Sequence, residues 1–77
     1  MILSEEEKKE MRPPFQLSLI MKRLEYSENS CVQIYQILTD ICKKQGKEHG
    51  TQITIKAVEL MEAGATEEEV IEALSKI

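Results

Sequence analysis

The stretch CVQIYQILTDIC, residues 31–42, decides the fold, because eight of its twelve residues are apolar. Its four polar residues recur at a spacing typical of one narrow face of an α-helix. They are Gln33, Gln36, Thr39 and Asp40. So broad an apolar stripe predicts a central helix that neighbouring elements cover on more than one side, with Leu38 in the core.

Helical patterns flank this stretch on both sides. Four apolar residues after Pro14 share one helical face. They are Leu17, Ile20, Met21 and Leu24. We expect helices over residues 14–25, 29–45 and 52–63, with a loop at 46–50 and Thr51 as an N-cap, and a short helix over 66–76 that begins with a Thr66–Glu69 capping box.

The fold class is therefore predicted as all-α, a small bundle of three to four short helices with a C-terminal helical hairpin. The whole chain, residues 1–77, is predicted as a single helical domain, because a second domain would have almost nothing to bury. Ser4 and Glu7 form a second capping-box pattern near the N-terminus, but no apolar face follows it. Residues 1–13 are thus expected as a loosely attached N-terminal turn.

The charge is concentrated in the last third of the chain. The net charge is −4, and residues 51–77 hold six glutamates against Lys56 and Lys76. This charge disfavours nucleic acid and anionic membranes and suits a protein partner with a basic surface. The chain has no apolar run long enough for a membrane span and starts with acidic residues, unlike a signal peptide, so we expect it in the cytoplasm.

Residues that could carry chemistry are few and dispersed. Cys31 and Cys42 lie about 16 Å apart if they share one helix, too far to hold one metal ion or to form a disulfide. His49 is expected in a solvated loop, and both thiols are expected as small core residues. We therefore expect no enzyme activity, no metal and no cofactor.

An apolar strip on the first main helix is the best candidate for binding another protein or a second copy of this chain. Phe15, Leu19 and Tyr26 lie opposite the core-facing residues, and Lys22 and Arg23 border them. Two alternatives stay open: Phe15 could fold back into the core, and Tyr26 could lie beyond the helix end. The acidic residues Glu67, Glu68 and Glu69 are expected to be solvated and to complete the partner-binding set.

Residues 60–74 resemble two known families. Gly64, Ala65, Thr66 and Val70 have the spacing of a helix-turn-helix, which implies a DNA-binding transcriptional regulator as the alternative function; the three glutamates that open the second helix oppose contact with DNA phosphates. The stretch EAGATEEEVIEAL, residues 62–74, also resembles the end of the carboxymuconolactone decarboxylase-like family. Redox members of that family carry a Cys-x-x-Cys pair and a histidine on the preceding helix, and this chain has no such pair there.

Overall fold

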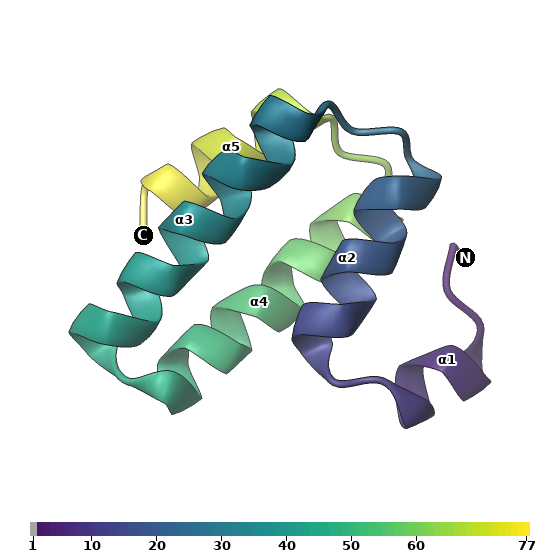
Figure 1. Cartoon of the computed structure of the whole chain (residues 1–77), viewed down its shortest axis with the longest axis horizontal. Helices are drawn as coiled ribbons and strands as arrows, with labels where there is room; N and C mark the ends of the chain where they lie inside the picture. The colour runs from purple at the N-terminus through teal and green to yellow at the C-terminus, as the bar shows by residue number, and fades with distance from the viewer. Residues whose placement is uncertain (1) are drawn as a thin grey trace.

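The computed structural model describes residues 2–77 and contains five α-helices and no strand in that range (Figure 1). The helices are α1 (Glu5–Glu10), α2 (Pro13–Arg23), α3 (Glu28–Gln45), α4 (Lys47–Glu62) and α5 (Glu67–Ser75). The predicted all-α fold class is confirmed. The helix count exceeds the prediction because the N-terminal turn is itself a helix.

The helix with the most neighbours is α4, which packs against α2, α3 and α5 (Figure 1). Residues 31–42 lie in α3, which is covered by two neighbours, α4 and α5, as predicted, although α4 has the more central place. Val32 and Tyr35, which widened the apolar stripe of α3, are 48% and 38% exposed. Leu38 is buried, as predicted.

One hydrophobic core is shared by α2, α3, α4 and α5 and by one residue that precedes α1. Its buried apolar side chains are Leu3, Leu17, Ile20, Met21, Ile34, Leu38, Ile41, Ile53, Ala57, Val58, Met61, Val70 and Leu74. Since burial of apolar area is the main favourable term in folding, these side chains hold the helices together.

The start of α4 differs from the sequence prediction. Residues 46–50 were expected as a loop, but α4 begins at Lys47, directly after Gly46, whose positive φ of 95° reverses the chain. Thr51 is not the N-cap: it lies inside the helix, where its hydroxyl donates to the Lys47 carbonyl at 2.9 Å. His49 consequently lies half-buried on a helix and not in a loop.

The first turn of α4 packs very closely on α3. A Cβ placed on the buried Gly50 would lie 2.1 Å from Cys42 Sγ and 3.1 Å from Cys42 Cα. A Cβ at that position would force Cys42 to move, so glycine favours the close approach of the two helices here without an unusual φ. The first turn of α4 therefore packs directly against α3.

The N-terminal segment has more structure than the predicted turn. The capping box is present: the Glu7 amide donates to Ser4 Oγ at 3.2 Å, and the Ser4 amide donates to the Glu7 carboxylate at 3.0 Å. No residue of α1 itself is buried, but Leu3, just before it, is fully buried. The sequence shows no apolar face here because the anchor precedes the helix.

Candidate interaction surface

The two sides of α2 have opposite environments. Leu17, Ile20 and Met21 face the core, whereas Phe15 is 63% exposed. Lys22 lies two helical turns from Phe15 on the same outward side and is exposed. Leu19 is half-buried and packs against the edge of the core. Phe15 therefore does not fold back into the core, and it stands beside Lys22 on the outward side of α2.

The predicted strip does not continue to Tyr26, because α2 ends at Arg23. Glu25 adopts a positive φ of 58°, which turns the chain, and Tyr26 lies in the loop before α3. The Tyr26 hydroxyl donates to the Ala65 carbonyl at 2.7 Å. Partial burial raises the pKa of Tyr26, and the charges of Glu67 and Glu69 add to the shift. Tyr26 thus joins two loops of the same chain.

Arg23 is engaged by the N-terminal segment. Its two terminal nitrogens donate to the two carboxylate oxygens of Glu7 at 3.0 and 2.8 Å, and one also donates to the Ile2 carbonyl at 2.7 Å. Hydrogen bonds from Arg23 and from the Ser4 amide lower the pKa of Glu7 from 4.5 to about 2. This bidentate geometry is the strongest form of an arginine–carboxylate pair.

The three glutamates of α5 have different environments. Glu67 is half-buried and accepts from the Ser27 amide at 3.0 Å and from Ser27 Oγ at 3.3 Å, and these hydrogen bonds lower its pKa. Glu69 accepts from the Thr66 amide at 3.1 Å in the capping box. Glu68 is exposed. The expectation that all three are solvated is therefore wrong for Glu67, which joins α5 to the loop before α3.

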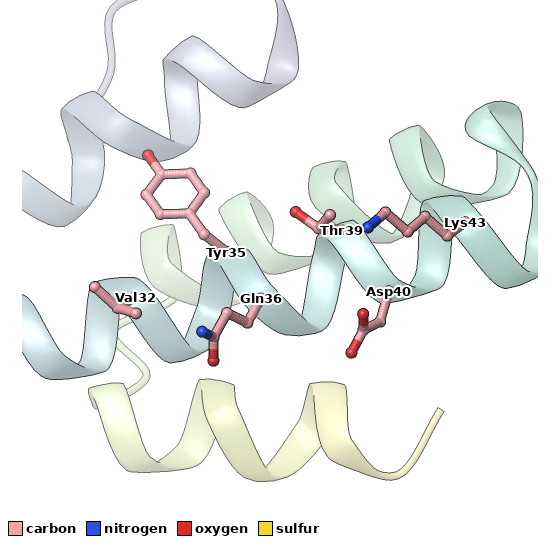
Figure 2. A pocket seen from close by; sticks show the side chains of 6 residues that line it. All are labelled: Val32, Tyr35, Gln36, Thr39, Asp40 and Lys43. Atoms are coloured by element: carbon pink, nitrogen blue, oxygen red, sulfur yellow. The ribbon is translucent and has the colours of Figure 1, made fainter.

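Two residues of the apolar stripe at residues 31–42 lie on the outward surface. Val32 and Tyr35 lie on α3, and the Tyr35 hydroxyl is hydrogen-bonded to Ser18 Oγ of α2. Figure 2 shows Tyr35 directed toward α2, and Gln36 and Asp40 directed to the side of α5. The signal for Val32 was present, because it lies four residues before Gln36, on the polar side of α3.

These side chains line an open depression on α3 (Figure 2). Its lining residues are Val32, Tyr35, Gln36, Thr39, Asp40 and Lys43. A second, smaller pocket of about 150 Å³ lies next to Tyr35 between α2, α3 and α4, and its lining includes Pro14, Leu38 and Cys42. Phe15 and Lys22 are thus exposed on α2 and Val32 and Tyr35 on α3, and the hydrogen bond between Ser18 and Tyr35 connects the two helices.

The cysteines and the histidine do not gather into a site. Cys31 and Cys42 are both half-buried thiols, and burial raises the pKa of Cys31. Among residues 2–77, no group of three or more histidine, cysteine, aspartate or glutamate side chains could hold a metal ion. In the same range, no helix has both the length and the apolar character needed to cross a membrane.

Comparisons with known proteins give no relative. No family model, no curated protein and no solved structure matches this chain. The two resemblances of residues 60–74 therefore receive no support from a family match. The candidate surface rests on the exposure and the contacts of its own residues.

Proposed function

We propose that this protein is a non-enzymatic interaction module that binds another protein through the outward side of α2 and α3. We call this surface the outer face and define it by Phe15, Lys22, Val32 and Tyr35. The observation that carries the proposal is the exposure of large apolar side chains on both helices, Phe15 at 63% on α2 and Val32 and Tyr35 at 48% and 38% on α3. Aromatic side chains are enriched at the centres of protein interfaces, where they fill pockets of the partner.

The contacts around Tyr35 support the same proposal. Its hydrogen bond to Ser18 fixes the ring between two helices, so binding would cost little of its rotamer entropy. An ordered aromatic side chain beside an open depression is a suitable acceptor for a protruding side chain of the partner. Lys22 adds positive charge to the outer face itself, and Lys43 adds positive charge and Asp40 negative charge to the depression.

The acidic residues of α5 belong to the same proposal in a smaller role. Glu68 and Glu72 are exposed, and they would favour a partner with a basic surface through long-range attraction. Arg23, Tyr26 and Glu67 are left out of the outer face, because each already makes a hydrogen bond within the chain. We further propose that the protein acts in the cytoplasm, where its two free thiols would stay reduced.

The test compares two exposed apolar residues on different helices. Phe15→Ser alters the outer face, and Ile55→Ser alters a residue of α4 that is 42% exposed. Each immobilised protein is exposed to a lysate of the source cells, and a retained protein is then purified and titrated by calorimetry. We expect the wild type and Ile55→Ser to bind it equally and Phe15→Ser to lose binding. Equal binding by all three would contradict the proposal.

A helix-turn-helix regulator remains the alternative function. The turn between α4 and α5 has the required glycine, Gly64, with a positive φ of 94°. The hydrogen bonds from Ser27 to Glu67 oppose this function, because they hold the first turn of the second helix against the chain's own loop. Fluorescence anisotropy with random-sequence duplex DNA at low salt tests it, since non-specific DNA binding is strongest there. Binding that weakens steeply with salt would favour the alternative.

A further inference from the structure

Residues 2–11, which we call the strap, lie against the body formed by α2–α5. They include α1, which contacts α2 (Figure 1). The strap contacts the core through the fully buried Leu3 and the half-buried Ile2. It also makes two ion pairs with the body, Glu7 with Arg23 of α2 and Lys8 with Glu62 of α4, at 2.8 and 2.9 Å. Side chains of α2 donate to its backbone carbonyls as well, Arg23 to Ile2 and Gln16 to Lys8 and Met11. We call the surface that the strap covers the slot. Its charged groups, Arg23 and Glu62, lie on α2 and α4.

This attachment is weaker than that of any other helix. The elements α2–α5 each bury at least two apolar side chains, whereas α1 buries none. The Arg23–Glu7 pair is partly exposed, at 41% and 29%, and salt screens such pairs. Segments with few buried apolar contacts open at lower free energy than the core. The strap is therefore the segment that opens first.

Detachment of the strap would leave the side chains that pair with it on the body. Arg23 would lose its bidentate partner, and Glu62, of which only 12% of the side chain is exposed, would lose Lys8. Glu62 Oε2 is already buried without a hydrogen-bond partner. An apolar site with an unpaired arginine and an unpaired carboxylate favours a segment that restores all three contacts.

The link between the strap and α2 is short and already extended. Met11 and Arg12 have φ, ψ values of −109°, 140° and −70°, 153°, and Pro13 begins α2. The Gln16 amide closes the link by donating to the Lys8 and Met11 carbonyls at 2.9 and 2.8 Å. Because a residue before proline favours this extended region, the link can swing outward without leaving an allowed conformation.

We propose that the strap detaches and that the slot then binds the strap of a second copy of this chain. The segment that best satisfies the slot is the one seen in it, with an apolar residue followed four positions later by an acid and five positions later by a base. Exchange of an identical element between two copies recreates every contact of the closed form and is a low-cost route to a dimer. This proposal does not depend on the outer face.

The first experiment offers the strap in trans. A fluorescent peptide of residues 2–12 is titrated into full-length Leu3→Asp, in which the chain's own strap no longer fills the slot. We expect binding that is weaker by about tenfold or more for the same peptide carrying Leu3→Asp, because the apolar contact is lost. Wild-type protein should bind the natural peptide more weakly than the variant, because its own strap competes. Equal binding of both peptides would overturn the proposal.

Two further measurements keep the test decisive. Circular dichroism shows whether Leu3→Asp is folded. If Leu3→Asp is unfolded, the peptide is titrated into the double variant Glu7→Gln with Lys8→Gln, which weakens the strap and leaves the slot intact. Light scattering of the wild type over increasing concentration should show a dimer that excess natural peptide dissociates. A wild type that stays monomeric at every concentration, or a dimer that the peptide leaves intact, would overturn exchange between copies.

Discussion

Two helices at opposite ends of the chain begin with nearly the same sequence and are held in different ways. Ser4-Glu5-Glu6-Glu7 opens α1, and Thr66-Glu67-Glu68-Glu69 opens α5, each with a complete capping box. In α5 the cap is followed by Val70 and Leu74, which are fully or almost fully buried. In α1 no buried residue follows, and the helix is held through its glutamate and lysine side chains and the preceding Leu3.

This difference shows that the start of a helix and the strength of its attachment depend on different residues. Capping satisfies the first backbone amides and fixes the start of both helices equally well. Attachment depends on the apolar residues that come next, since helices this short are marginal without tertiary packing. We therefore expect changes in α5 to act on the whole fold and the matching changes in α1 to act locally.

The largest effect is expected at the buried residues of α5. Leu74→Ala should lower the free energy of unfolding by about 2–5 kcal/mol, because it removes buried side-chain atoms and leaves a cavity. Urea denaturation followed by circular dichroism measures it, with Glu72→Ala on the exposed side of the same helix as the control. A loss confined to α5, with α2–α4 still melting at the wild-type midpoint, would show that α5 is as detachable as α1.

The two caps provide the closest comparison. Thr66→Ala should lower global stability by about 0.5–2 kcal/mol through the lost N-cap hydrogen bond. Ser4→Ala removes the same bond in α1, and there we expect faster hydrogen exchange of the α1 amides with a smaller change in the global transition. Equal global losses in the two variants would mean that α1 is part of the cooperative core.

Acid should weaken both attachments but release only α1. The pKa of Glu7 is lowered to about 2, so its pairing with Arg23 contributes fully above pH 4.5 and is lost as the pH falls toward 2. The lowered pKa of Glu67 gives the same sign for the Ser27 contact. NMR spectra across this range should show the α1 amides changing first, because Val70 and Leu74 still hold α5. Simultaneous loss of both helices would contradict this order.

The smallest effects are expected at the exposed glutamates of the two first turns. Glu5→Gln and Glu68→Gln each remove one charge near a helix N-terminus, and neither side chain makes a hydrogen bond or ion pair with residues 2–77. Both variants should lower the melting temperature only slightly, through the weakened interaction with the helix dipole. A large drop in the melting temperature of either variant would mean that its carboxylate accepts hydrogen bonds within the chain, as those of Glu7 and Glu67 do.

The sequence predicts where the helices lie along the chain better than it predicts which helices contact each other. Both capping boxes and the burial of Leu38 follow from local pattern and are confirmed. The early start of α4 did not follow from local pattern, because the residues that begin it include Gly50, which packs against Cys42 of a different helix.

The candidate site was predictable only in part for the same reason. The exposure of Phe15 agrees with its place opposite the core face of α2. The contacts of Arg23 with Glu7, of Tyr26 with Ala65 and of Glu67 with Ser27 span 16, 39 and 40 residues. Periodicity within one helix carries no information about such pairs. It could not show that these side chains form hydrogen bonds within the chain and are therefore not free to bind a partner.

The contact between Gly50 and Cys42 constrains which sequences this fold accepts. Any side chain at position 50 meets the sulfur, the Cβ and the Cα of Cys42, so a substitution at one position changes what the other tolerates. Among variants selected for folding, we expect position 50 to remain glycine while position 42 holds cysteine, and the two to change only together. Deep mutational libraries would register this as strong epistasis between two residues that lie eight positions apart on either side of the turn at Gly46.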